Sequence, residues 1–133
     1  MDDTTSTNKT VLIVEDELPF RQIYREAFSM HGYNVIEAED GQEALQLVEQ
    51  KAPDLVLLDI ILPKMTGFDV LTNLKTNPAY KHIPVIVYSV LDNKADIERA
   101  MKLGANDFTI KGQTPAAEVL DKARRLLGEI PKS

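Results

Sequence analysis

Five short runs of apolar, mostly β-branched residues recur along the chain, with helical patterns between them. The runs cover Thr10–Val14, 34–37, 54–58, 84–88 and Asp107–Ile110. The first, third and fourth runs are apolar almost throughout, which is typical of strands buried on both faces of a parallel sheet. The alternation predicts an α/β fold of five β–α units, with right-handed crossovers and helices on both faces of the sheet.

Each helical pattern carries start and stop signals. Asp40, with Glu43 three residues later, is typical of an N-cap followed by its capping-box partner. Further helix starts are predicted at Pro19, Thr66, Asp92 and Pro115, and helix ends at Gly32, Pro53, Asn77, Gly104 and Gly128. These signals predict units of about 20–25 residues, the usual size of a strand with its crossover helix.

Length and composition exclude several classes of protein. The 133 residues fit one domain, and the absence of cysteine excludes disulfides, thiolate zinc sites and cysteine nucleophiles. The 21 acidic and 15 basic residues give a net charge of −6, which argues against nucleic acid or an anionic membrane as a partner bound through bulk charge. No apolar run could span a membrane, and the polar segment 1–9 is unlike a signal peptide. We therefore expect a cytoplasmic protein with a disordered tail over 1–9, one domain over 10–128 and a short tail over 129–133.

Polar side chains mark the ends of four of the five predicted strands. They are Glu15, Asp16 and Glu17 after the first strand, Asp59 after the third, Ser89 after the fourth and Lys111 after the fifth. Because the carboxyl ends of parallel strands meet at one edge of a sheet, we expect these side chains to share one crevice, where ligands of such folds bind.

The expected crevice suits a metal ion and a phosphoryl group. Carboxylates held close together repel one another, and Mg²⁺, which prefers oxygen ligands, relieves that repulsion. One carboxylate could then attack phosphorus while a lysine and a hydroxyl bind the phosphoryl oxygens. Simpler roles remain open, since acids stabilise helix N-termini in any fold and an aspartate before a loop is a common turn residue.

Four sequence segments resemble the receiver domain of two-component response regulators, the chemotaxis-regulator-like family. They read VLIVEDE at 11–17, DLVLLDIILPKMTGFDVL at 54–71, PVIVYS at 84–89 and GANDFTIKG at 104–112. The resemblance covers about residues 9–128. It implies a flavodoxin-like (βα)5 three-layer sandwich whose parallel sheet has the strand order 2-1-3-4-5.

The resemblance also implies an acceptor and a metal site. Asp59 would accept the phosphoryl group from a histidine kinase or a phosphotransfer protein. Asp16 would bind Mg²⁺ directly, Glu15 directly or through water, and Asp59 and the backbone carbonyl of Ile61 would complete the protein ligands.

Three further residues would respond to the phosphoryl group. Ser89 would be the switch hydroxyl, Lys111 the lysine that pairs with the phosphate, and Phe108 the aromatic switch residue. Movement of Ser89 and Phe108 would change the face formed by the fourth helix, the fifth strand and the fifth helix, where an output protein would bind.

Three positions depart from the family pattern. The acidic pair begins with Glu15 where aspartate is commoner, so its contact with the metal is expected to be altered or mediated by water. Ser89 replaces the commoner threonine and keeps the hydroxyl. Gly112 replaces a proline whose peptide bond is typically cis, so the loop after Lys111 is expected to be trans or more mobile.

We expect a single-domain regulator, monomeric or dimerising on phosphorylation, that catalyses only its own phosphorylation and dephosphorylation. A receiver excised from a larger regulator and a phosphorylation-independent scaffold are the alternatives. A phosphatase with an aspartate nucleophile would need a second aspartate at position 61, where this chain has isoleucine. A nucleotide-binding module would need a glycine-rich or Ser/Thr-rich loop after the first strand, where this chain has three acids.

Overall fold

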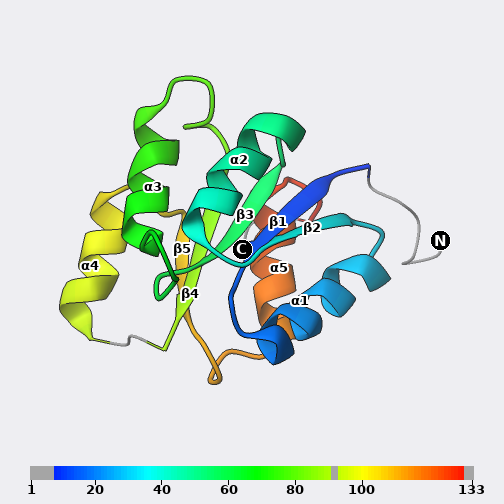
Figure 1. Ribbon diagram of the computed structural model, residues 1–133. Helices are drawn as coiled ribbons and strands as arrows, with labels where there is room; N and C mark the ends of the chain where they lie inside the picture. The colour runs from blue at the N-terminus through cyan, green and yellow to red at the C-terminus, as the bar shows by residue number, and fades with distance from the viewer. Residues whose placement is uncertain (1–7, 91–92, 131–133) are drawn as a thin grey trace.

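All five apolar runs form strands in the computed structural model of the protein, which describes residues 8–90 and 93–130. The strands are β1 Thr10–Val14, β2 Asn34–Ala38, β3 Leu55–Asp59, β4 Val85–Ser89 and β5 Asp107–Ile110. They pair in parallel in the order β2-β1-β3-β4-β5, which confirms the flavodoxin-like fold (Figure 1).

Within the described residues, five helices cover the two faces of the sheet. They are α1 Leu18–Met30, α2 Gly41–Lys51, α3 Gly67–Thr76, α4 Lys94–Lys102 and α5 Ala116–Leu126. Apolar residues of α1 and α5 pack on one face, and those of α2, α3 and α4 pack on the other, which gives two separate hydrophobic clusters (Figure 1). No helix in the described ranges is both long enough and apolar enough to cross a membrane.

Side-chain caps begin three of the helices. The carboxylate of Asp40 accepts a hydrogen bond from the Glu43 N–H at 2.8 Å, as the sequence predicts. The Thr66 hydroxyl likewise accepts from the N–H of Asp69. The predicted cap of α4 was wrong, because Asn93 fills that role and accepts from the N–H of the residue three positions later. The predicted cap residue, Asp92, lies outside the described residues.

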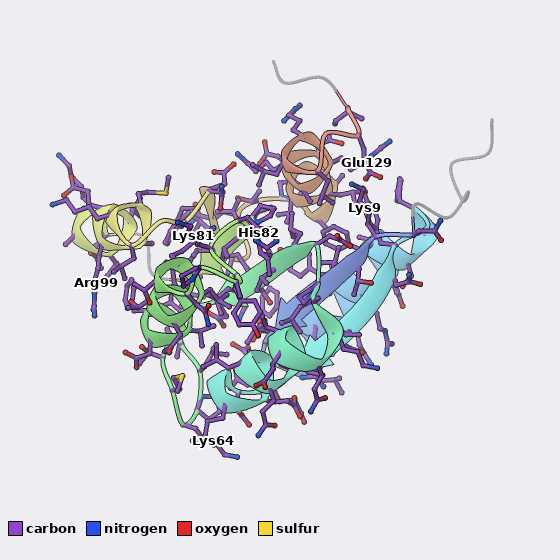
Figure 2. The ribbon with its side chains drawn as sticks, turned by 90° about the horizontal axis from the view of Figure 1, so that it is seen from above. Lys9, Lys64, Lys81, His82, Arg99 and Glu129 are labelled. Atoms are coloured by element: carbon purple, nitrogen blue, oxygen red, sulfur yellow. The ribbon has the colours of Figure 1, made fainter. Side chains whose placement is uncertain are left out.

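The two ends of the described chain meet at the amino edge of the sheet. Lys9, just before β1, donates through Nζ to the carbonyl oxygen of Leu127 after α5. Lys9 and Glu129 lie near one another in Figure 2. The Tyr33 hydroxyl, just before β2, donates to the carboxylate of Glu129. These contacts tie the two ends of the described chain together at the edge of the sheet opposite to the carboxyl ends of the strands.

Gly67, the first residue of α3, allows this helix to approach the carboxyl end of β3 closely. A Cβ atom at this position would lie 2.3 Å from the carbonyl oxygen of Asp59 and 2.6 Å from the Cα atom of Ile60. Both are backbone atoms, so no side-chain rotation could relieve the overlap. The Gly67 N–H also donates to the Ile60 carbonyl oxygen at 2.8 Å, which fixes the start of α3 against the strand end.

We expect the substitution Gly67→Ala to lower the free energy of unfolding by about 3 kcal/mol, at the upper end of the usual cost of overpacking. Urea titration followed by circular dichroism measures this change. Gly128→Ala is the control, because a Cβ at Gly128 meets nothing within 4 Å and the substitution adds only the strain of its positive φ angle. Equal losses in the two variants would contradict the close-approach explanation.

Candidate functional site

The carboxyl ends of β1 and β3 bring four acidic side chains together. Carboxylate oxygens of Glu15, Asp16, Glu17 and Asp59 all lie within 4.8 Å of one another. The sheet causes this arrangement, because Val14 is paired with Leu58 and the next residues along the two chains are therefore neighbours. The four acids that the sequence predicted to share a crevice do meet.

A buried ammonium group lies among these carboxylates. Lys111 Nζ is 2.5 Å from Glu15 Oε1, 3.0 Å from Asp59 Oδ2 and 3.1 Å from Glu17 Oε1. Glu15 is fully buried, Asp59 is 2% exposed and Lys111 is 5% exposed, whereas Asp16 and Glu17 are exposed. The cluster therefore has a dry interior and a rim that water can reach.

Glu15 is held by three hydrogen-bond donors. Its Oε1 atom accepts from Lys111 and from the Tyr88 hydroxyl at 2.8 Å, and its Oε2 atom accepts from the backbone N–H of Glu17 at 3.0 Å. Burial raises the pKa of the Glu15 carboxyl above its ordinary value, although the hydrogen bond from Lys111 opposes that effect. The fold thus holds this carboxylate where ionisation is costly.

The two carboxylate oxygens of Asp59 have different hydrogen-bond donors. Its Oδ2 atom accepts from Lys111, and its Oδ1 atom accepts from the backbone N–H of Ile61 at 3.1 Å. Ile61 is therefore beside the cluster, and its side chain is exposed. That the backbone carbonyl oxygen of Ile61 binds the metal stays a prediction.

The position of Lys111 follows from β5 and from the loop after it. Its backbone N–H donates to the carbonyl oxygen of Ser89 at 2.9 Å, and its ammonium lies 4.5 Å from the centre of the Phe20 ring. Burial opposes the charged form, but the hydrogen bonds to Glu15 and Asp59 outweigh it and raise the pKa of Lys111. The lysine stays charged at any physiological pH.

The loop after Lys111 follows a path that proline could not take. Gly112 has a φ of +84°, whereas the proline ring fixes φ near −65°. No peptide bond in the described residues is cis. The peptide bond before Gly112 is therefore trans, which confirms the expectation of a trans loop after Lys111. Gly112 itself has a left-handed backbone conformation.

The two predicted switch residues lie on the face of the sheet opposite to the interior of the acid cluster. Phe108 is half-buried and packs on the face covered by α2, α3 and α4. Ser89 is fully buried at the end of β4 and, by strand alternation, lies on the same face as Phe108. Tyr88 and the interior of the cluster lie on the opposite face, under α1 and α5. The backbone of Ser89 nevertheless reaches the site, because its carbonyl oxygen accepts from the N–H of Lys111.

Sequence reasoning missed two contacts of the site. It included Tyr88 only as part of the apolar run 84–88, but the hydroxyl of this buried residue donates to Glu15. It placed Glu17 in the expected crevice but gave it no contact there, whereas this residue pairs with Lys111 and its N–H donates to Glu15. The run of three acids at 15–17 was a signal for Glu17, whereas nothing in an apolar strand pattern indicated the direction of the tyrosine hydroxyl.

The donor set fits a hard divalent cation. Four carboxylates offer oxygen ligands, and Mg²⁺ usually binds one or two carboxylates and keeps several waters. The exposed Asp16 on the rim can supply a ligand beside open solvent. The cluster has the chemistry of a magnesium site.

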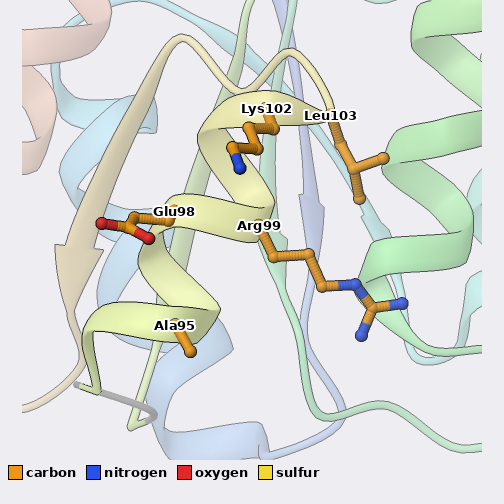
Figure 3. A pocket seen from close by; sticks show the side chains of 5 residues that line it. All are labelled: Ala95, Glu98, Arg99, Lys102 and Leu103. Atoms are coloured by element: carbon orange, nitrogen blue, oxygen red, sulfur yellow. The ribbon is translucent and has the colours of Figure 1, made fainter.

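A separate pocket of about 410 Å³ lies along α4 (Figure 3). Its lining residues are Ala95, Glu98, Arg99, Lys102 and Leu103. None belongs to the acid cluster. Arg99 points toward α3, where its guanidinium lies 4.0 Å from the centre of the Phe68 ring, and Glu98 points to the other side of the helix. The pocket lies on the surface of α4, the helix that the family resemblance predicts to be part of the binding face for an output protein.

Comparisons with known proteins agree with this fold and site. The family model of the response regulator receiver domain matches residues 11–123. The probable transcriptional regulator ycf27 of Guillardia theta is 38% identical over 115 residues, which are 86% of this chain and 44% of that protein. This chain spans half or less of the length of the first curated relatives it matches.

Solved structures of response regulators share the fold. The phosphorylated cyanobacterial phytochrome response regulator RcpA is 30% identical, with a TM-score of 0.80 over 91% of this chain and 94% of that one. The Mn²⁺-bound form of response regulator Rcp1 is 26% identical, with a TM-score of 0.79 over 94% of this chain and 97% of that one.

We expect the substitution Glu15→Gln to raise the free energy of unfolding at pH 7.5 without Mg²⁺. A raised pKa in the fold means that the ionised carboxylate is less stable there than in the unfolded chain, so removing the charge relieves that cost. The gain should be largest above the raised pKa and should shrink as the pH falls through it toward the ordinary value of 4.5, because glutamate is then protonated in both states. Urea midpoints between pH 4 and pH 8 measure this profile. A midpoint that falls at pH 7.5 would contradict it.

Proposed function

The chain belongs to the response regulator receiver domain family of two-component signalling, and from that membership we propose that Asp59 accepts a phosphoryl group in a reaction that needs Mg²⁺. The observation that carries the proposal is the position of this carboxylate. Asp59 is buried, its Oδ2 atom is 3.0 Å from Lys111 Nζ, and three further carboxylates lie beside it. The donor is a phosphohistidine of a histidine kinase or of a phosphotransfer protein.

In the proposed reaction an oxygen of Asp59 bonds to phosphorus while the bond between phosphorus and the donor's imidazole nitrogen breaks. Mg²⁺ held by Glu15, Asp16, Asp59 and the Ile61 carbonyl would neutralise charge on the phosphoryl oxygens. The Mn²⁺-bound state of the structural relative Rcp1 supports a divalent cation here.

The protein's own cation has a second role in this proposal. Lys111 already lies against the acceptor carboxylate, so its ammonium needs little movement to pair with a phosphoryl oxygen. Charge-assisted contacts of this kind stabilise the developing negative charge. The phosphorylated state of the relative RcpA supports the same use of the site.

Phosphorylation would then act as a switch between two populations. The new negative charge attracts the Ser89 hydroxyl from the end of β4, and Phe108 fills the space that the serine leaves. This would change the shape of the surface formed by α4, β5 and α5 and its affinity for an output protein. The half-buried state of Phe108 supports the proposal, because such a side chain can exchange between an inner and an outer position.

In this proposal the protein acts in the cytoplasm as a single-domain regulator. It is a monomer or dimerises on phosphorylation. It catalyses only its own phosphorylation and dephosphorylation. Its longer curated relatives include transcriptional regulators, so a receiver within a larger regulator is the second form that this function can take.

We expect acetyl phosphate with Mg²⁺ to add the mass of one phosphoryl group to the intact protein. The addition should vanish in Asp59→Asn and in the presence of EDTA. Asp54→Asn is the matched control, because Asp54 is an exposed carboxylate just before the other end of the same strand, where it accepts from the backbone N–H of Thr10. This control should accept the group as the unsubstituted protein does.

Intact-mass spectrometry reads all these samples. A phosphoryl group that persists in Asp59→Asn would overturn the acceptor assignment. No addition under any condition, with the protein folded, would instead favour the phosphorylation-independent scaffold.

A further inference from the structure

The hydroxyl of Tyr88 is fixed beside the acid cluster. Tyr88 is fully buried in β4, and its ring packs edge-on against Tyr24 of α1 with the ring centres 5.0 Å apart. Its oxygen lies 2.8 Å from Glu15 Oε1, to which it donates. The ring cannot turn without disturbing the packing under α1, so the hydrogen bond has a fixed origin.

The donors around Glu15 leave its carboxylate with few free positions. A carboxylate oxygen can accept two hydrogen bonds, and Oε1 already accepts from Tyr88 and Lys111. Oε2 accepts from the Glu17 N–H and has one position left. A cation in the cluster would therefore meet a single, oriented oxygen of Glu15.

This restraint matters because Glu15 is longer than the aspartate usual at this position in the family. The extra methylene adds a rotatable bond, and an unrestrained glutamate would lose more conformational freedom on binding a cation. A phenylalanine would fill the same space in the core without holding the carboxylate. The tyrosine hydroxyl is the one part of this side chain that the packing of the apolar face does not require.

We propose that Tyr88 is a positioning residue that holds the Glu15 carboxylate in the orientation in which the acid cluster binds a divalent cation. This inference rests on the proposed magnesium site. It also links Glu15 to Tyr88. An aspartate at position 15, shorter by one methylene, would not reach the tyrosine hydroxyl in the same way.

Tyr88→Phe tests the inference, with Mg²⁺ binding measured by isothermal titration calorimetry. We expect about tenfold weaker affinity, the lower end of what loss of a partner behind a metal ligand costs. Tyr33→Phe is the matched control. It also removes a hydroxyl that donates to a carboxylate, but that carboxylate is Glu129 at the opposite edge of the sheet, so Mg²⁺ affinity should not change.

A double-substitution cycle separates positioning from a general loss of packing. In a Glu15→Asp background, Tyr88→Phe should change the Mg²⁺ affinity by no more than about twofold, the scatter usual between independent sites. Circular dichroism and urea midpoints without metal establish that each variant is folded.

Two results would overturn the inference alone. The first is an unchanged affinity in Tyr88→Phe. The second is an equal, tenfold loss in the unsubstituted and the Glu15→Asp backgrounds, which would mean that the hydroxyl acts on the fold and not on Glu15. Failure of the unsubstituted protein to bind Mg²⁺ would be a different result, because it would overturn the proposed metal site as well.

Discussion

One buried ammonium group holds the site together. The sheet places Glu15 and Asp59 side by side at the ends of β1 and β3, where two like charges out of water repel strongly. Lys111 reaches them from β5 and also contacts Glu17 on the rim. Removing one partner of a buried ion pair typically costs about 3–5 kcal/mol, because the remaining charge is left uncompensated. The parallel sheet and the position of Lys111 therefore depend on one another.

The same contact leaves the site unbalanced in a way that suits its proposed chemistry. The cluster holds four carboxylates and one ammonium, which pairs with three of them, so it keeps an excess of negative charge. A divalent cation reduces that excess, and a phosphoryl group on Asp59 gives Lys111 a new anion to pair with. Burial raises the pKa of Glu15, whereas burial opposes the charge of Lys111 and the hydrogen bonds to Glu15 and Asp59 outweigh it and raise the pKa of the lysine. The buried charge of Glu15 lowers the stability of the fold, and such a loss is common where function requires buried charge.

Strand ends were predictable from the sequence because apolar runs such as 54–58 and 84–88 have sharp polar boundaries. A parallel sheet then requires Asp59 and Lys111 to lie at one edge. The hydropathy pattern could not predict which residue caps α4 or where a single hydroxyl points. Asparagine and aspartate are both common N-caps, so the sequence did not distinguish Asp92 from Asn93, which begins the helix. The role of Tyr88 depends on the direction of its hydroxyl toward Glu15, and the packing of the sheet sets that direction.

The most direct test of the account is the Mg²⁺ dependence of the melting temperature of Lys111→Met. Without its ammonium, the cluster keeps only repelling carboxylates, so the variant should melt well below the unsubstituted protein in metal-free buffer. Mg²⁺ would then be the sole counter-charge and would bind without a competing cation, so saturating Mg²⁺ should raise the melting temperature of the variant more than that of the unsubstituted protein. An equal or smaller rise in the variant would contradict the claim that Lys111 is the counter-ion that holds these carboxylates together.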